Sequence, residues 1–441
     1  MVLLGHSVSI RGLIWRLIEA CLLVLAMAIA AQGELPQGPR FAFVGLLFPL
    51  ISILALQVFA MYQRERQPRI VIFGKLLIAY LCIGTAMMII GEFFHSLAIP
   101  SWVLARALAF GLVGSFLFRL IAPWASRVFL PPLPILVVGN GKLAEEVSAL
   151  LRDTGSHEGI SFVGIHNPLQ NDRPLRDIVQ EMEVGEIIVA AEDQRGLPLA
   201  ELLQYKLDGI AVTDYVNFIE REKRYLPVDG MRPSWLIFGD GFAQGPGRTV
   251  VKRMLDIGLS ATLLLMLAPV MALAAACIYL ESGKPILFRQ TRLGKGACPI
   301  TIVKLRSMIQ DAEKNGVPQW AVNQDPRVTR IGRIIRSTRI DEIPQLFNVL
   351  KGDMSFVGPR PERAYFAEEL RKQIPYFDLR HTVKPGLTGW AQVNYSYGSS
   401  VDDARAKLRY DLYYIKNHSL MLDLLIVMST VRIVLFRQGA R

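Results

Sequence analysis

The chain has 441 residues, of which 52% are hydrophobic and 20% are charged; soluble globular proteins carry about 25% charged residues, so this composition favours a membrane protein. The formal net charge of +11 suits a nucleic acid, an anionic lipid surface or a phosphate-rich substrate, and composition does not separate these three. The four cysteines show no CxxC spacing, which indicates neither a disulfide framework nor a zinc site.

The first 130 residues contain four apolar windows, at 13–32, 41–61, 70–91 and 102–122. Each approaches the ~20 residues that a helix needs to cross ~30 Å of hydrocarbon. The charged residues inside these windows lie near window ends, where side chains can reach the interface: Glu19, Lys75, Arg106 and Arg119. The sequence therefore predicts a four-span transmembrane unit over residues 1–130.

Arginines gather in alternate connections of this unit. They lie before or in the first turn of the first window, separate the second from the third, and follow the fourth: Arg11, Arg16, Arg64, Arg66, Arg69 and Arg127. By the positive-inside rule both ends of the unit are cytoplasmic. The remainder of the chain is therefore expected to begin in the cytoplasm.

Residues 131–240 have the pattern of a Rossmann-like α/β domain. An apolar strand at 135–138 leads into Gly139-Asn140-Gly141-Lys142-Leu143-Ala144, and a helical pattern follows at 145–152. A second strand is expected at 185–190. The G-x-G-x-x-A turn can hold a phosphate at a helix N-terminus, but no acidic residue ends a second strand at the expected spacing. The glycines are interpreted as structural, in a domain with no cofactor-binding residues.

Residues 241–441 begin with a glycine-rich linker and an apolar run at 258–280 that is long enough to cross a membrane. Basic residues flank both sides of the run, and Pro269 at its centre favours a kink. A re-entrant helix that dips into one leaflet fits both features better than a proline-kinked fifth span. The last apolar stretch, 420–436, contains Asp423 and Arg432 and is predicted to be an amphipathic helix at the interface.

The candidate chemistry centres on the adjacent carboxylates Asp341 and Glu342. A short helix is expected over 342–350 with Asp341 as its N-cap. An ionised Asp can attack phosphorus to form an acyl phosphate, and a neighbouring Glu can hold a divalent metal or move a proton. The cations around the pair suit a pyrophosphate: Lys304, Arg306, Arg336, Arg339 and Arg360. Alternatively, the pair does no more than cap a helix.

Residues 248–441 resemble the bacterial sugar transferase family, the monotopic polyprenyl-phosphate hexose-1-phosphate transferases. The motifs that carry the resemblance are Lys-Arg-x-x-Asp-Ile at 252–257, Lys-x-Arg-Ser-Met at 304–308, Asp-Glu-x-Pro-Gln-Leu-x-Asn-Val-Leu-x-Gly-Asp-Met-Ser at 341–355 and Gly-Pro-Arg-Pro at 358–361. The whole chain resembles the large members, in which four spans and a Rossmann-like domain precede the catalytic part. The family often has Ser-Pro at the kink of its re-entrant helix, where this chain has Ala268-Pro269.

The resemblance implies a ping-pong, Mg²⁺-dependent reaction. Asp341 would attack the phosphate attached to the sugar of a UDP-sugar and expel UMP, and a polyprenyl phosphate such as undecaprenyl phosphate would then take the sugar phosphate. Glu342 would assist and, with Asp341, place the metal. Residues at family positions near the phosphates are Lys304, Arg306, Arg336 and Arg360.

The resemblance also implies a multi-pass protein of the bacterial inner membrane, with its catalytic domain on the cytoplasmic face and a role in exopolysaccharide or other surface-glycan synthesis. The sugar, a ligand for residues 131–240 and a homodimer through them are left open. A non-catalytic membrane scaffold that senses a ligand through the Rossmann-like domain is the alternative. Nucleic-acid binding is disfavoured because the chain has no recognition helix or aromatic RNA motif.

Overall fold

The computed structural model describes all of the protein except residues 1, 4, 5, 8, 9, 33–38, 60, 62–67, 98, 130, 131, 159, 169, 171, 172, 194, 243, 244, 311–324, 396, 397, 399 and 436–441. Arg64 and Arg66, on which the orientation partly depends, thus lie outside the described residues. The chain forms two compact units. One contains Met1–Ile188 and Asp193–Val212, and the other contains Val189–Glu192 and Thr213–Arg441.

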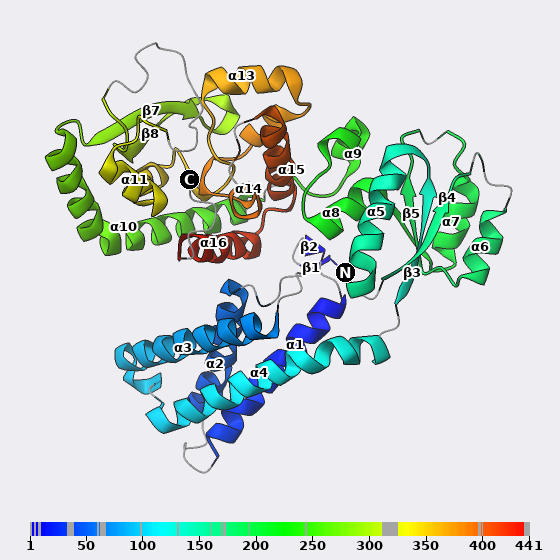
Figure 1. The fold of residues 1–441 in the computed structure, drawn as a ribbon, viewed down its shortest axis with the longest axis horizontal. Coiled ribbons are helices and arrows are strands. Elements are labelled where there is room, and N and C mark those ends of the chain that lie inside the picture. The colour runs from blue at the N-terminus through cyan, green and yellow to red at the C-terminus, as the bar shows by residue number, and fades with distance from the viewer. Residues whose placement is uncertain are drawn as a thin grey trace. The chain divides into compact units, whose positions relative to one another are not determined.

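Four helices form a bundle in the first unit (Figure 1): α1 (Ile10–Ala30), α2 (Pro39–Val58), α3 (Arg69–Phe93) and α4 (Ser101–Phe129). Helices α1 and α3 each contact both α2 and α4, which closes the bundle around an apolar core. Many large apolar side chains point outward instead, among them Leu46, Ile70, Leu81 and Val113. A bundle that is apolar on both its inside and its outside suits a lipid environment. Two short strands, β1 (Val2–Leu3) and β2 (His6–Ser7), precede it, and the 3-10 helix η1 (His95–Leu97) joins α3 to α4.

Among the described residues, three helical segments are long and apolar enough to cross a membrane: Arg69–Phe93, Ser101–Ala125 and Gly247–Ser282. The first two belong to the bundle and the third lies in the second unit. A shorter apolar segment, Phe43–Val58, lies within α2. These segments support a membrane protein, and the count of four spans in the bundle stays a prediction.

Two of the charges inside the apolar windows form a buried ion pair. Glu19 of α1 is 1% exposed, and Arg119 Nη1 of α4 lies 2.5 Å from its Oε1 atom. Arg119 also donates to the carbonyl oxygen of Ser115, whose hydroxyl lies 2.9 Å from that of Tyr80 on α3. The expectation that Glu19 and Arg119 reach the interface separately is therefore wrong. Charges in an apolar bundle are tolerated when they pair with one another, and this pair joins helices that are distant in sequence.

The middle of the chain forms the small parallel sheet that the alternating pattern predicts. Its strands are β3 (Leu133–Gly139), β4 (Ile160–His166), β5 (Glu186–Ala190) and β6 (Ala211–Asp214), in the order β4-β3-β5-β6. The connecting helices are α5 (Gly141–Glu158), α6 (Leu175–Glu181) and α7 (Leu199–Leu207), and α8 (Tyr215–Lys223) follows β6. The predicted strands 135–138 and 185–190 correspond to β3 and β5. Gly139 and Gly141 have φ of 153° and 70°, so both glycines are needed for the turn between β3 and α5.

The second unit is mostly helical (Figure 1). After η2 (Val228–Gly230) and α9 (Pro233–Phe238) come the long helix α10 (Pro246–Ser282) and an antiparallel hairpin of β7 (Leu287–Leu293) and β8 (Pro299–Leu305), joined by η3 (Lys295–Ala297). The short strands β9 (Ser355–Val357) and β10 (Gly386–Thr388) pair in parallel. The remaining helices are α11 (Arg330–Ser337), η4 (Ile340–Glu342), α12 (Gln345–Lys351), α13 (Ala364–Gln373), η5 (Phe377–His381), α14 (Trp390–Asn394), α15 (Val401–Asn417) and α16 (Leu420–Leu435).

Both ends of helix α10 are held by hydrogen bonds to other elements of the second unit. Near its start, Arg253 donates to the carbonyl oxygens of Val349 and Leu350 at the end of α12, at 2.6 and 2.7 Å. At its other end, Glu281 accepts from the backbone N–H groups of Arg330 and Ile331, which begin α11. Between these contacts the helix exposes large apolar side chains, including Leu265, Met266 and Leu273.

Candidate active site

The two carboxylates lie in η4, between α11 and α12. The bonds of this turn run from the N–H of Glu342 to the carbonyl of Arg339 and from Ile343 to Ile340. Helix α12 begins only at Gln345, so the prediction that Asp341 caps a helix over 342–350 is wrong. Pro344 has no N–H, and this interrupts the bonding between the turn and the helix. The turn buries both Asp341 and Glu342, each 7% exposed.

Glu342 is surrounded by cations. Lys304 Nζ of β8 lies 2.9 Å from its Oε1 atom, and Arg360 Nη2 lies 2.6 Å from the same oxygen. Arg339 Nη1 lies 3.9 Å away. Burial alone would raise the pKa of Glu342, but Arg360, Lys304 and Arg339 outweigh it and hold the pKa well below its usual value. Glu342 is therefore ionised at neutral pH.

Asp341 has the opposite character. Its carboxylate accepts no hydrogen bond from any described residue. Burial, followed by the negative charge of Glu342, raises the pKa of Asp341 to about 6, although Lys304, Arg339 and Arg360 oppose the shift. Two adjacent carboxyls with divergent pKa values are typical of catalytic pairs with different roles. An anionic oxygen that is dehydrated and lacks a hydrogen-bond donor is well suited to nucleophilic attack.

The structure separates the four predicted phosphate-binding residues into two groups. Lys304 and Arg360 contact Glu342, as described above. Arg306, which directly follows β8, is instead buried against the C-terminal end of α10. There its Nη2 donates to the carbonyl oxygens of Ser282 and Gly283 at 2.9 and 2.8 Å. Arg336 is half-buried on α11. Hydrogen bonds from Arg327 are the main cause of the lowered pKa of Asp325, and the charge of Arg336 adds to this effect. Contact with phosphate stays a prediction for all four residues.

Arg360 belongs to a short strap, residues 358–362, that other elements hold by its backbone. Gly358 N donates to Thr388 O, and Gly386 N donates to Pro359 O, both at 2.9 Å. A Cβ atom on Gly386 would lie 2.1 Å from Gly358 N, so this close approach requires glycine. The Lys-Pro-Gly-Leu-Thr-Gly stretch at 384–389 thus has a clear structural role in holding the strap.

The carboxylate pair is chemically suited to a magnesium ion. Mg²⁺ is usually held by one or two carboxylates, with water and substrate phosphates completing its shell. The three cations all face Oε1 of Glu342, so its Oε2 and the carboxylate of Asp341 remain as hard oxygen ligands. No group of three or more His, Cys, Asp or Glu side chains occurs among the residues described. A metal here would therefore depend on substrate phosphates for further ligands.

Sequence reasoning missed several residues that support this site. Arg292 of β7 donates from Nη1 to Pro361 O at 3.2 Å, and Leu293 N donates to Glu362 O. Arg380 of η5 donates from Nη2 to Arg360 O at 3.2 Å and to Asp411 of α15 at 2.8 Å. Neither Arg380 nor Asp411 lies in a motif singled out above, because their role depends on tertiary contacts alone.

Comparisons with known proteins agree on one part of the chain. The model of the family described as "Bacterial sugar transferase" matches residues 247–437, which include every candidate residue named above. A UDP-N-acetylgalactosamine-undecaprenyl-phosphate N-acetylgalactosaminephosphotransferase of Aeromonas hydrophila is 49% identical over 191 residues, 43% of this chain and 45% of that protein. A UDP-glucose:undecaprenyl-phosphate glucose-1-phosphate transferase of Escherichia coli K12 is 42% identical over 289 residues, 62% of this chain and 61% of the relative.

A third relative is named for the same activity as the E. coli protein. It comes from Caulobacter vibrioides and is 47% identical over 182 residues, which cover 41% of this chain and 68% of the relative. The chain thus spans 45% and 61% of the lengths of the Aeromonas and Escherichia proteins. The Escherichia match is longer than residues 247–437 and so includes other parts of the chain.

Proposed function

This chain belongs to the bacterial sugar transferase family, and we propose that it transfers a sugar 1-phosphate from a UDP-sugar to undecaprenyl phosphate, releasing UMP. The activities for which its relatives are named, with UDP-glucose and UDP-N-acetylgalactosamine, support this substrate class. The observation that carries the proposal is the buried Asp341 carboxylate, which accepts no hydrogen bond from the part of the chain that the structure describes and lies beside a Glu342 that is paired with three cations. The reaction would initiate synthesis of an exopolysaccharide or another surface glycan.

The proposed chemistry has two steps. An Asp341 oxygen attacks the phosphorus that bears the sugar, the bond from that phosphorus to the UMP oxygen breaks, and an acyl phosphate forms. A phosphate oxygen of the lipid then attacks the same phosphorus and releases the Asp341 carboxylate. Lys304, Arg339 and Arg360 supply positive charge beside the reacting phosphate. A bound Mg²⁺ would neutralise phosphate charge, with Asp341 and Glu342 as its protein ligands.

The first experiment is a product assay with the purified full-length protein, Mg²⁺, undecaprenyl phosphate and a panel of UDP-sugars. We expect UMP and a lipid-linked sugar from at least one member of the panel. Without the lipid, a two-step reaction should release about one UMP per enzyme molecule and then stop. If no UDP-sugar gives either UMP or a lipid product, the proposed function is wrong. If lipid product forms but no UMP is released in the absence of the lipid, the covalent intermediate is contradicted and the transferase function stands.

We further propose that α10 enters the membrane and returns on the same side, in an inner-membrane protein whose catalytic unit is cytoplasmic. A helix of 37 residues is about 55 Å long at 1.5 Å per residue. If it crossed ~30 Å of hydrocarbon, its two ends would lie on opposite sides of the membrane. Arg253 near its start binds the end of α12, however, and Glu281 near its end binds the start of α11, and both of these helices belong to the second unit. Pro269 lies inside the helix and provides a place for a bend.

Cysteine accessibility tests this topology. Thr249→Cys and Lys284→Cys place exposed thiols on either side of the apolar run, in a background whose four native cysteines are replaced by serine. A membrane-impermeant maleimide should label both thiols in inside-out vesicles and neither in right-side-out vesicles, because both flanks face the cytoplasm. Labelling of the two thiols from opposite sides would establish a true crossing and contradict re-entry.

A further inference from the structure

A buried ion pair that lies outside the site itself contacts the strap that carries Arg360. Arg380 is 6% exposed and Asp411 is 2% exposed, and Arg380 Nη2 lies 2.8 Å from Asp411 Oδ2. The same Nη2 atom donates to the carbonyl oxygen of Arg360 at 3.2 Å. Arg380 Nη1 lies 3.5 Å from Glu362 Oε1. One guanidinium therefore contacts the strap at two places, the backbone of Arg360 and the side chain of Glu362.

We propose that Arg380, anchored by Asp411, is a positioning residue that holds the Arg360 strap so that the Arg360 guanidinium meets Glu342. This inference rests on the proposed transferase function and adds a residue to its machinery. Arg380 acts through Arg360. Arginine suits the task because its planar fork directs several donors at fixed angles, which lysine cannot reproduce.

The energetics favour positioning over simple stabilisation of the fold. Burial raises the pKa of Asp411 to about 6 in spite of the adjacent Arg380, whereas Asp411 and Glu362 raise the pKa of Arg380 in spite of its own burial, so the cost of burying the pair and the attraction within it largely offset each other. Replacing a buried ion pair of this kind with well-packed apolar residues is often neutral or stabilising. The Arg380–Asp411 pair is therefore better explained by the position in which it holds the Arg360 strap than by a contribution to the stability of the fold.

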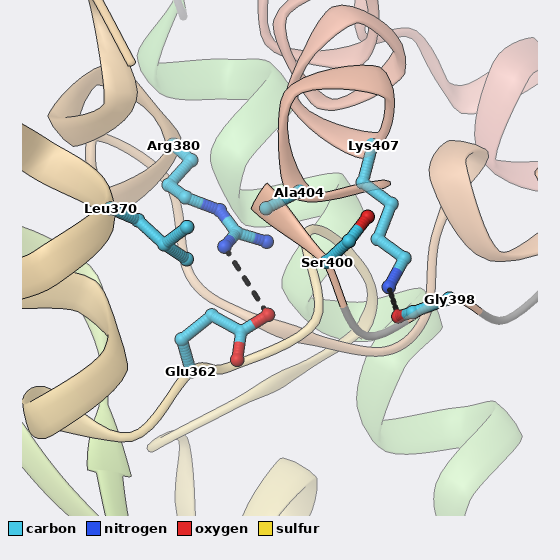
Figure 2. Close-up of a pocket in the computed structure, with 7 residues that line it drawn as sticks. All are labelled: Glu362, Leu370, Arg380, Gly398, Ser400, Ala404 and Lys407. Carbon is cyan, nitrogen blue, oxygen red and sulfur yellow. Dashed lines mark hydrogen bonds and ion pairs between the residues drawn. The ribbon is translucent and has the colours of Figure 1, made fainter. Parts of the chain in front are cut away.

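The cleft next to the pair does not suggest a ligand of its own. Figure 2 shows Arg380 and Glu362 facing each other on one side of the cleft and Lys407 reaching Gly398 on the other, with Ser400 between them. The cleft holds about 30 Å³, which is enough for water but far below the roughly 300 Å³ of a small-molecule site. The Arg380 guanidinium is therefore directed at the strap and at Asp411.

A double-mutant cycle between Arg380 and Arg360 tests the proposal. In the wild-type background, Arg380→Lys should lower kcat for UMP release about 10- to 100-fold, since small displacements near a reacting centre have effects of that order. In an Arg360→Lys background the same change should cost less than about twofold, because the strap no longer carries the group that Arg380 positions. Thermal unfolding of each variant in nanodiscs gives the stability change separately.

Arg405→Lys is the matched control, because Arg405 of the same unit forms a partly exposed ion pair with Asp229 and should leave kcat unchanged in both backgrounds. If Arg380→Lys protein is not recovered folded, Asp411→Asn replaces it, because it keeps the shape of the anchor without its charge. Losses that multiply in the double variant, or an unchanged kcat in the single variant, overturn the positioning role. A wild-type protein that releases no UMP from any UDP-sugar would overturn the proposed function instead.

Discussion

Replacing Asp341 with asparagine is expected to abolish covalent labelling of the protein by a UDP-sugar carrying ³²P at the phosphate next to the sugar. Asparagine has nearly the same shape but no anionic oxygen, and an amide cannot form the acyl phosphate. Loss of a nucleophile typically lowers kcat about 10⁴-fold or more, and UMP release should fall by at least that factor. Labelling is measured on the denatured protein, so that only a covalent adduct is counted.

The Asp341→Asn protein should fold, and at alkaline pH it should be more stable than the wild-type protein. The pKa of Asp341 is raised by burial to about 6 in the folded protein, above the usual 3.8. The folded state therefore holds this proton more tightly than the unfolded state, so stability falls as the pH rises from about 4 through about 6. Asparagine does not titrate, and we expect Asp341→Asn to be about 1 to 3 kcal/mol more stable than wild type at pH 8.

The matched control for both measurements is Asp378→Asn, because Asp378 is half-exposed and pairs with Arg371 on the surface. It should keep wild-type labelling and change stability by less than about 0.5 kcal/mol. Covalent labelling that persists in Asp341→Asn would assign the nucleophile to another residue. An Asn variant that is less stable than wild type at pH 8 would indicate that the Asp341 charge is well solvated or paired, contrary to the geometry.

Local patterns in the sequence predicted the long elements well. The apolar window at 70–91 corresponds to α3, the strand at 135–138 lies within β3, and the expected helix at 145–152 lies within α5. Each of these depends on the periodicity or length of an apolar run. The 3-10 turn of Asp341 and Glu342 is not predicted, because a carboxylate before an apolar helical pattern is also typical of an N-cap.

Contacts between distant residues were beyond local reasoning. Glu19 and Arg119 are 100 positions apart, and each one alone resembles an interfacial charge. The cluster around Glu342 was only partly predictable, since its cations were recognised as a basic setting but their convergence on one oxygen depends on β8 and on the strap. Arg380 and Asp411 carry no local signal at all, because a buried ion pair is defined by its partner and its burial.

Replacing Glu342 with glutamine is expected to slow the first half-reaction about 10²- to 10³-fold, a loss typical of removing one charged group that organises a reaction centre. The Glu342 charge draws Lys304 and Arg360 to a single oxygen. Without it those cations repel one another and can no longer hold their positions beside the phosphate. Rapid-quench measurement of UMP release without lipid isolates this step from the later transfer.

The pH dependence of the same variant distinguishes an electrostatic role from other roles. Asp341 reacts as its anion, so the rate of UMP release should rise with pH through the pKa of Asp341, about 6 in the wild-type protein. The negative charge of Glu342 raises that pKa, and Arg360 lowers it. The midpoint should therefore move to lower pH in Glu342→Gln and to higher pH in Arg360→Met. Midpoints that stay fixed, or that move in the same direction in both variants, would show that the rate reports the titration of a different group.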